Sequence, residues 1–342
     1  MKRLPVEDLE HIFKNTQDIW ESFRDKSIFV TGGTGFFGKW LLESFIYVNE
    51  KLSLNAKITT LTRNPEAFLK EFSFYKEHTN TVQFVKGDIL NYDFNLEEKF
   101  QFIIHAATTS DEKTNLSNPI ILADSIIQGS RNIFAFAIKN PIESFLNISS
   151  GAIYGIQPNE IQRTKEEDSF IIDLYNPKAS YYESKRVAEM YGSLHFDQFK
   201  LPIKTARCFA FIGPHLPLDK HFAIGNFINN ILNEEDIIIR SNGMSIRSYM
   251  YMSDLIVWLL KILIKGENNT AYNVGSDYPV KIKDLAGIIS GNFNSKVIVQ
   301  GEGSNEAGNL YVPDIEKAKS LGLTIKINLK DAIDKTIKYY KK

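Results

Sequence analysis

The chain has 342 residues, with 40 Lys and Arg against 41 Asp and Glu, and its formal net charge is −1 at neutral pH. Affinity for nucleic acid rests on clustered cations that neutralise phosphates, so this balance argues against a nucleic-acid partner. The length exceeds that of a typical single core, which predicts one large domain carrying a smaller one.

The single cysteine, Cys208, cannot form a disulfide within the chain or contribute to a cysteine-based metal cage. It lies in an apolar run, which predicts a position in the core. The N-terminal residues turn acidic where a signal peptide needs an apolar stretch, and the apolar run 255–263 is too short to cross a bilayer. We therefore expect a cytoplasmic protein with no membrane anchor and no metal site.

Residues 8–23 place apolar side chains at helical spacing, which predicts an amphipathic helix ahead of the main fold, packed on its surface. Short apolar runs rich in β-formers then alternate with helical segments. Strands separated by helices imply right-handed crossovers, so the pattern predicts an α/β protein with a doubly wound parallel sheet, the Rossmann fold. The predicted strands are 27–30, 58–61, 82–85, 102–106 and 145–148, and the predicted helices are 39–49 and 121–138.

Beyond Pro214 the pattern changes to shorter elements, which predict a smaller C-terminal α/β lobe for the substrate, folded against the first domain. We expect a helical extension over 1–25, a dinucleotide-binding domain over 26–210 and the substrate lobe over 211–342. The lobe's predicted elements are a strand at 236–240, a helix at 254–264, a strand near 271–274 and a helix at 329–340.

Three glycines, Gly32, Gly35 and Gly38, lie between a predicted strand and a predicted helix. Glycines there allow a tight turn and close approach of the backbone to a pyrophosphate, and the helix N-terminus offers free N–H groups. The alternative is an ordinary glycine-rich turn. Because strand and helix flank the glycines correctly, we predict dinucleotide binding, with Phe36 and Phe37 in the same loop.

The end of the second strand should carry the residue that discriminates NAD from NADP. That run contains no acid and ends in Arg63, which slightly favours the 2′-phosphate of NADP, although a solvated loop Arg is the alternative. Asp88, followed by Ile89, closes the third strand and could accept a hydrogen bond from the adenine amino group. A surface turn is the equally simple interpretation of Asp88.

Tyr181 and Lys185 are four residues apart, which on a helix places them on one face. A cation beside the phenol favours the phenolate, so Tyr181 can take a proton from an alcohol whose carbon gives up a hydride. Ser150 ends a predicted strand, at the sheet edge where open α/β sheets bind ligands, and can bond the reacting oxygen.

Together these motifs resemble the extended short-chain dehydrogenase/reductase superfamily, in its nucleotide-sugar epimerase/dehydratase branch. The resemblance covers about residues 26–322. It continues past the cofactor domain through segments 207–214, 247–254 and 272–276. The motifs of the first domain are the glycine loop, Asp88-Ile89, His105-Ala106-Ala107, the segment 149–155 and Tyr181 to Lys185.

The resemblance implies Ser150, Tyr181 and Lys185 as the catalytic trio, with NAD or NADP as the cofactor and a nucleoside-diphosphate sugar as the substrate. It implies a homodimer that forms through the helix bearing Tyr181 and the preceding helix. Arg247 would hold the diphosphate, a task suited to a guanidinium. The implied cofactor residues are Gly32, Gly35, Phe36, Phe37, Gly38, Arg63, Asp88, Ile89, Ala106, Ala107, Tyr181 and Lys185, and the implied substrate residues are Thr108, Ser150, Gly151, Tyr181, Ala210, Asn226 and Arg247.

The chain departs from the branch at Gly151 and Ala152, where 4,6-dehydratases typically place an Asp–Glu pair for proton transfer. We therefore favour hydride transfer at a sugar carbon, most often C4, by an epimerase that retains its cofactor or a ketosugar reductase that consumes NADPH. The alternatives are a dehydratase with acid/base groups elsewhere and a non-catalytic dinucleotide sensor. A second departure is Ala210, where many relatives carry an Asn that touches the substrate.

Several other polar residues have weaker interpretations. His105 is expected in the packing at the strand end, and residues 165–168 are expected to form a solvated loop. We predict a substrate loop after Pro214, with four polar candidates, which are His215, Asp219, His221 and Asn226.

Overall fold

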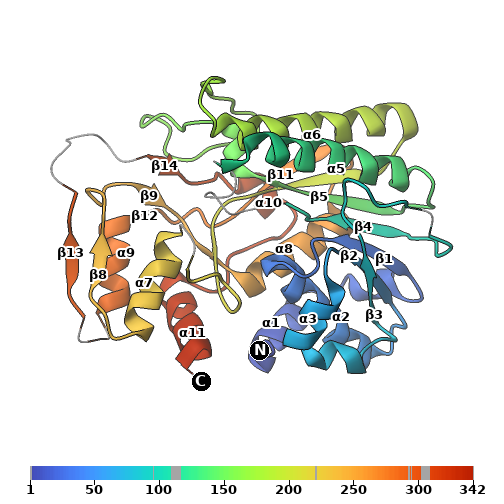
Figure 1. The fold of residues 1–342 in the computed structure, drawn as a ribbon, viewed down its shortest axis with the longest axis horizontal. Helices are drawn as coiled ribbons and strands as arrows, with labels where there is room; N and C mark the ends of the chain where they lie inside the picture. Colours follow the sequence, from blue (N-terminus) through green and yellow to red (C-terminus); the bar gives the residue numbers. More distant parts are fainter. Residues whose placement is uncertain are drawn as a thin grey trace. The chain divides into compact units, whose positions relative to one another are not determined.

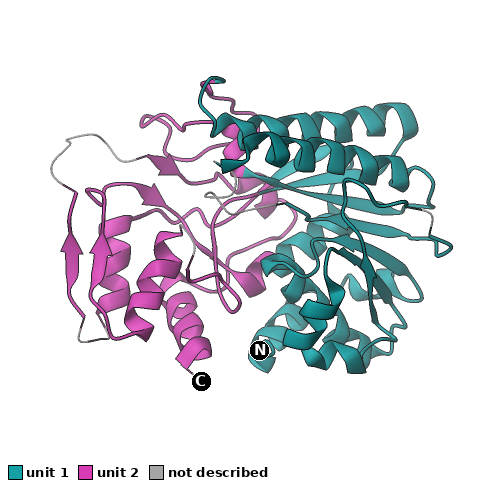
Figure 2. Ribbon diagram, viewed as in Figure 1, with its two compact units in different colours: residues 1–150, 174–207, 256–272 teal, residues 151–173, 208–255, 273–342 magenta. Residues whose placement is uncertain are grey.

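We describe a computed structural model of the chain over residues 2–94, 96–108, 117–219, 222–291, 293, 295–301 and 309–341. The chain forms two compact units (Figure 2). Unit 1 comprises residues 1–150, 174–207 and 256–272, and unit 2 comprises 151–173, 208–255 and 273–342. This division differs from the predicted boundaries at 25 and 210, because the chain passes between the units several times.

Unit 1 is built on a seven-stranded sheet of order β11-β6-β5-β4-β1-β2-β3 (Figure 1). The strand order reverses at β1, as in dinucleotide-binding doubly wound folds, and the pairs from β3 through β5 are parallel. This confirms the predicted Rossmann fold. The strands are β1 (Ser27–Thr31), β2 (Lys57–Thr62), β3 (Val82–Lys86), β4 (Phe102–His105), β5 (Ser144–Ser150), β6 (Ile203–Cys208) and β11 (Thr270–Val274).

Helices cover both faces of this sheet, so the central strands β4 and β5 are buried along their whole length. The helices α5 (Pro119–Ala137) and α6 (Ala179–Phe199) lie on one face, and α2 (Phe36–Leu52) and α3 (Pro65–Glu71) lie on the other (Figure 1). Successive residues of β1 point to opposite faces, yet Ile28, Phe29 and Val30 are all buried. Cys208 is also buried, as predicted.

The N-terminal segment contains a helix, as predicted, but this helix is shorter than the predicted range 8–23. The expectation that the segment packs on the surface is wrong, because residues from it form part of the core of unit 1. The helix α1 (Val6–Asn15) ends at Thr16, and a 3₁₀ turn, η1 (Trp20–Phe23), follows. The Thr16 hydroxyl donates to Ile12 O, and Trp20 Nε1 donates to the Thr16 hydroxyl over 2.8 Å, which fixes the bend.

The rings of Trp20 and Phe23 are fully buried. Each packs edge-on against Phe45 of α2, with centroids 5.2 and 5.0 Å apart, and Phe23 also contacts Phe102 of β4. The helical spacing correctly indicated an apolar face, but it contained no information on what covers that face.

Unit 2 is a smaller α/β lobe of short strands, as predicted, but two elements predicted for it belong elsewhere. The strand predicted near 271–274 is β11 of the unit 1 sheet, and most of the helix predicted at 254–264 belongs to unit 1. The strand β9 (Ile246–Arg247) lies between β12 (Val280–Lys281) and β14 (Leu310–Tyr311), β7 (Phe211–Ile212) pairs with β10 (Met250–Tyr251), and β8 (Ile237–Ile239) pairs with β13 (Val297–Val299). The helices that carry residues of this unit are α7 (Ala223–Leu232), α8 (Met252–Lys265), α9 (Ile282–Ser290), α10 (Glu316–Lys319) and α11 (Leu329–Lys341), and α8 continues into unit 1.

A buried asparagine, Asn273, ties three segments of unit 2 together. Its Nδ2 donates to Thr164 O (2.8 Å) and Asp314 O (3.0 Å), and its Oδ1 accepts from the Tyr154 hydroxyl (2.6 Å). The Asn273 N–H donates to the carboxylate of Glu166, whose pKa is raised by burial. The expectation of a fully solvated loop at 165–168 is therefore wrong at Glu166, because a contact distant in sequence buries it.

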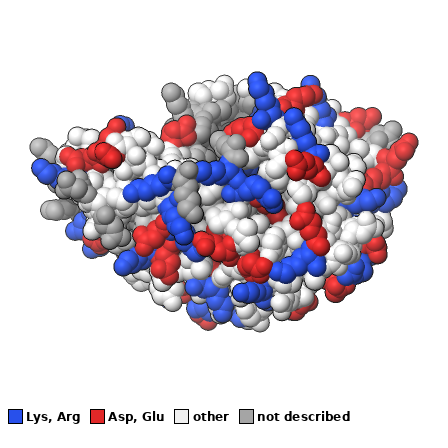
Figure 3. Space-filling view, turned by 90° about the horizontal axis from the view of Figure 1, so that it is seen from below, with Lys and Arg blue, Asp and Glu red and all other residues white. Residues whose placement is uncertain are grey.

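Acidic and basic side chains are intermingled on the face shown in Figure 3. No helix among the described residues is both long enough and apolar enough to cross a membrane.

Candidate functional site

The glycine loop of unit 1 lies against the end of β4. Gly32 has φ +76°, and a Cβ there would lie 2.7 Å from the carbonyl of Ala106 and 2.8 Å from the N atom of Ala107. The loop is closed by a hydrogen bond from Gly35 N–H to Gly32 O over 3.0 Å. Glycine at 32 is therefore required both by the backbone conformation and by the neighbouring chain.

The helix α2 begins directly after this turn and leaves its N-terminus open for an anion. Gly35 is the N-cap, and no side chain caps the first turn, which starts with Phe36 and Phe37. A Cβ at Gly38 would collide with the backbone of Gly32 and Gly33, so α2 packs tightly on the loop. Uncapped N–H groups and the helix dipole fit the pyrophosphate of a dinucleotide.

Gly33 is a further glycine of the loop, not among the predicted site residues, that packing requires. A Cβ there would collide with the side chain of Thr60 on β2, whose hydroxyl donates to Val30 O. The Gly32-Gly33 pair in the sequence could have indicated this position. The contact with Thr60, however, can be seen only in the folded structure.

The predicted adenosine-end residues follow β2 and β3. Arg63 comes directly after β2 and is exposed, which leaves its guanidinium accessible to a ligand. Asp88 is half-buried, and its Oδ1 accepts from Leu90 N–H over 3.0 Å, so one of its oxygens stabilises the turn. Ile89 is buried against Gly129 of α5.

The end of β4 is held to β1 by hydrogen bonds. The N–H groups of Ala106 and Ala107 donate to the carbonyl and the hydroxyl of Thr31, both over 3.1 Å. His105 is buried between Thr31 Oγ1 (2.8 Å) and Ser130 Oγ (3.0 Å), as expected of a packing residue. Burial, assisted by the positive charge of Lys185, lowers the pKa of His105 to about 3. Thr108 follows and is exposed.

The predicted catalytic residues lie on two adjacent elements of unit 1. Ser150 is buried at the carboxyl end of β5, and Lys185 on α6 donates from Nζ to the carbonyl of Ile148, two residues before it, over 3.0 Å. Tyr181 is half-buried one helical turn before Lys185, and it packs against Leu122 and Ile126 of α5. The lysine is thus fixed at the strand end that carries the serine.

The substrate candidates Gly151, Ala210, Asn226 and Arg247 belong to unit 2. Gly151 opens a 3₁₀ turn, η3 (Gly151–Tyr154), and a Cβ there would lie 2.7 Å from the ring of Phe209. Ala210 is half-buried and accepts from Met250 N–H over 3.0 Å.

Arg247 ends β9 and is half-buried. Its Nη1 donates to the carbonyls of Ile246 (2.8 Å) and Asn309 (2.7 Å), and its guanidinium lies 6.0 Å from the centre of the Tyr311 ring. These contacts hold the guanidinium in a defined orientation, as an anion-binding Arg requires.

The polar residues predicted after Pro214 do not share one environment. His215 is buried against Tyr339 of α11, whereas Asn226 is exposed on α7. Asp219 follows His215 in the same loop, and His221 lies outside the described residues. Among the described residues, no three His, Cys, Asp or Glu side chains are placed to hold a metal ion.

The sheet order, the glycine loop, the serine at the end of β5 and the tyrosine and lysine on α6 are typical of a dinucleotide-binding protein of the short-chain dehydrogenase/reductase type. Residues 28–275 match the family described as the NAD dependent epimerase/dehydratase family. The chain therefore belongs to the NAD dependent epimerase/dehydratase family.

Two relatives illustrate the range of reactions among similar proteins. The dTDP-D-glucose 4,6-dehydratase of Dictyostelium discoideum is 29% identical over 281 residues, which cover 76% of this chain and 61% of that protein. A trifunctional UDP-glucose 4,6-dehydratase, 3,5-epimerase and reductase of Arabidopsis thaliana is 26% identical over 329 residues, covering 93% of this chain and 48% of that protein. The chain thus spans less than two thirds of either relative.

The fold is also similar to solved structures. UDP-N-acetylglucosamine 4-epimerase from Methanobrevibacter ruminantium, in complex with UDP-N-acetylmuramic acid, matches with a TM-score of 0.80 and 22% identity, over 93% of this chain and 98% of that one. At this identity the likeness concerns the fold.

Proposed function

We propose that the protein modifies a nucleoside-diphosphate sugar by NAD(P)-dependent hydride transfer at a sugar carbon, C4, as an epimerase. The observation that carries this proposal is the placement of Ser150 and Lys185 at one strand end, with Tyr181 on the same helix as the lysine. The family and the epimerases and dehydratases among its relatives support the sugar-nucleotide substrate.

The chemistry assigned to the residues is proton transfer and orientation. The bound dinucleotide supplies or accepts the hydride. The Tyr181 hydroxyl takes the proton from the sugar hydroxyl as that carbon is oxidised, and it returns the proton on reduction. The Lys185 ammonium favours the ionised form of Tyr181, and the Ser150 hydroxyl donates a hydrogen bond to the sugar oxygen.

Dehydration is less well supported, although relatives carry it out. Loss of water requires an acid for the leaving oxygen and a base for the neighbouring carbon. The two positions after Ser150 are Gly151 and Ala152, which carry no titratable group.

A ketosugar reductase that uses NADPH is the second candidate. The observation in its favour is the exposed Arg63 directly after β2, where no acid is present to bind a 2′-hydroxyl. A reductase consumes the reduced cofactor, whereas an epimerase regenerates it in each cycle.

The first experiment is to denature the purified protein and identify the released dinucleotide by chromatography and mass. Stoichiometric NAD supports an epimerase. An empty site that binds NADPH more tightly than NADH, with the preference lost in Arg63→Ala, supports the reductase. A protein that binds neither dinucleotide contradicts both.

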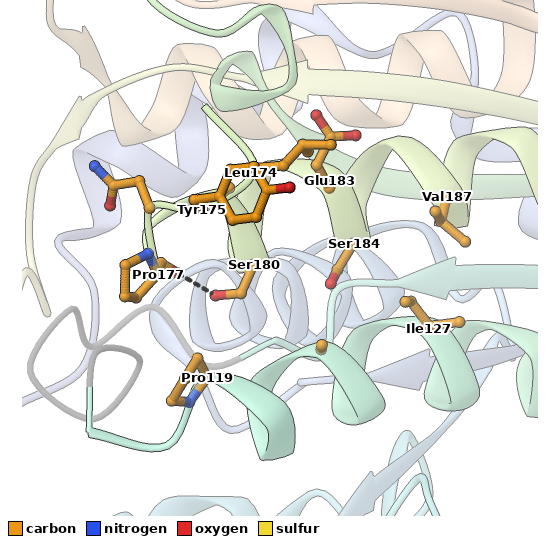
Figure 4. A pocket seen from close by; sticks show the side chains of 12 residues that line it. Pro119, Ile127, Leu174, Tyr175, Pro177, Ser180, Glu183, Ser184 and Val187 are labelled. Carbon is orange, nitrogen blue, oxygen red and sulfur yellow. Dashed lines mark hydrogen bonds between the residues drawn. The ribbon is translucent and has the colours of Figure 1, made fainter. Parts of the chain in front are cut away.

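We also propose a homodimer formed through α5 and α6. An apolar cavity of about 410 Å³ lies between the starts of these helices and the segment before α6 (Figure 4). Leu174 and Tyr175 line it, and they are 70% and 99% exposed. Exposed apolar side chains beside a cavity are typical of a contact surface.

Light scattering on the eluting protein tests the dimer. A Leu174→Asp substitution should convert a dimer into a monomer, because it places a charge in the apolar contact. Tyr278→Asp is the control, since Tyr278 is also exposed but lies in unit 2. A monomeric unsubstituted protein, or a dimer insensitive to Leu174→Asp, would contradict the proposal.

A further inference from the structure

The ring of Phe209 occupies the space that a side chain at position 151 would need. A Cβ at Gly151 would lie 2.7–2.8 Å from three atoms of that ring, closer than real Cβ contacts. The backbone at Gly151 does not adopt a positive φ, so its conformation does not require a glycine. The neighbouring ring, and not the backbone conformation, therefore excludes a side chain directly after Ser150.

Phe209 is held both at its backbone and at its ring. Its N–H donates to Val274 O over 3.0 Å, which fixes its backbone. The Tyr311 ring packs against it with centroids 4.7 Å apart. Simple displacement of the ring is therefore hindered.

Tyr311 in turn is fixed by the short sheet of unit 2. The strand β14 pairs in parallel with β9, with Tyr311 opposite Arg247, and the Arg247 guanidinium lies over the Tyr311 ring. The position of Phe209 thus depends on β9, the strand that carries Arg247, which we expect to bind the diphosphate.

The consequence concerns which reaction can follow oxidation at C4. Elimination needs a base that removes the proton from the carbon next to the ketone. The C–H electron pair then forms the C=C bond, and the C–O bond breaks as an acid delivers a proton to the leaving oxygen, which departs as water. A carboxyl group at 151 would lie directly beside the serine, but the Phe209 ring takes its place.

We propose that Phe209 is a specificity-determining residue, which keeps position 151 free of a side chain and so restricts the site to hydride transfer without loss of water. This inference rests on the proposed function. It assigns to Phe209 a role that its motif position alone does not indicate.

The packing is tested by a double-variant cycle on thermal unfolding. Gly151→Ala should lower the unfolding midpoint by several degrees in the unsubstituted protein and have little effect in Phe209→Ala. Gly287→Ala is the matched control, because a Cβ there meets nothing within 4 Å. Equal effects of Gly151→Ala in both backgrounds would overturn the steric argument, and this readout needs no substrate.

The specificity is tested by product analysis of Gly151→Asp/Ala152→Glu with and without Phe209→Ala. Each protein is incubated with NAD and either UDP-glucose or dTDP-glucose, and the masses of the sugar nucleotides are measured by mass spectrometry. A product lighter by one water only in the variant lacking Phe209 supports the proposal, as does folding of the variant only when Phe209 is absent. Equal product in both backgrounds, or none in either, overturns it.

The unsubstituted protein separates this inference from the proposed function. Exchange of label between the substrate C4 and the dinucleotide is measured in the same mixtures. Absence of exchange with either nucleotide sugar counts against the proposed function on these substrates, while the unfolding cycle still decides whether Phe209 excludes a side chain at 151.

Discussion

The two units of this protein reach stability in different ways. In unit 1, neighbouring strands of four to seven residues pair with each other. Aromatic and aliphatic side chains on both faces of the sheet are buried. In unit 2, several strands have only two residues, and buried polar groups such as Asn273 join segments far apart in the chain.

This difference shows which parts of such a protein can be predicted from short stretches of its sequence. A parallel sheet repeats one rule, an apolar strand followed by a covering helix, so each element carries its own pattern. A lobe assembled from three separate segments depends on contacts such as Tyr154 to Asn273, which are 119 positions apart and leave no local pattern.

The largest expected effect is chemical and belongs to unit 1. Tyr181→Phe should reduce kcat by roughly 10²- to 10⁴-fold, because it removes only the proton-transfer group. Its unfolding midpoint should stay near that of the unsubstituted protein. Tyr182→Phe, at the neighbouring position on α6, is the control and should keep its turnover. Normal turnover of Tyr181→Phe would remove the residue from the mechanism.

The next effect tests whether unit 1 depends on its N-terminal aromatic residues. Phe23→Ala should reduce the free energy of unfolding by about 3–5 kcal/mol, since the ring is fully buried against Phe45 and Phe102. Phe199→Ala removes a ring that is 47% exposed on α6 and should cost much less. Denaturant titration of both variants measures the difference, and similar values would mean that the segment is peripheral.

A polar substitution provides the corresponding test in unit 2. Asn273→Ala should cost about 3 kcal/mol of unfolding free energy, because it leaves the carbonyls of Thr164 and Asp314 and the Tyr154 hydroxyl without their partner. Tyr154→Phe removes one of these bonds and should cost about 1 kcal/mol. If Asn273→Ala costs no more than Tyr154→Phe, the contrast drawn between the units fails.

Much of the fold, and the placement of the proposed site residues, followed from sequence patterns. Gly32 and Ser150 lie at the ends of strands, and Lys185 lies in the second turn of the helix α6, so their placement follows once the strands and helices are assigned. The burial of Phe23 and the effect of Phe209 on Gly151 did not follow. Both depend on rings that approach from other segments of the chain.

The glycine loop offers a smaller, more selective effect. Gly32 and Gly322 have nearly the same φ, +76° and +75°, but only Gly32 has a neighbouring chain within Cβ contact. Gly322→Ala should cost about 1–2 kcal/mol through backbone strain alone. Gly32→Ala should cost more and abolish dinucleotide binding, measured by calorimetry. Equal costs with binding retained would show that the close approach to Ala106 is unimportant.

The smallest expected effect concerns a buried cation in unit 1, Lys204. Lys204 on β6 is buried, donates to the Ser144 hydroxyl over 2.8 Å, and has a pKa lowered by burial to about 8. The charged amine in the folded state therefore reduces stability fully below about pH 8. This penalty declines as the pH rises toward the ordinary lysine pKa of about 10.4, where the unfolded chain also loses the proton.

Between pH 7 and pH 9 the free energy of unfolding should therefore rise by roughly 1 kcal/mol from this group. Lys204→Met should remove that pH-dependent increment and stabilise the protein at pH 7, since a methionine fills similar space without a charge. Denaturant titrations at the two pH values measure the increment as the difference between the proteins. If the variant retains the same increment, or is less stable at pH 7, then the hydrogen bond to Ser144 offsets the cost of burying the amine. Unit 1 would then depend on a buried polar contact much as unit 2 depends on Asn273.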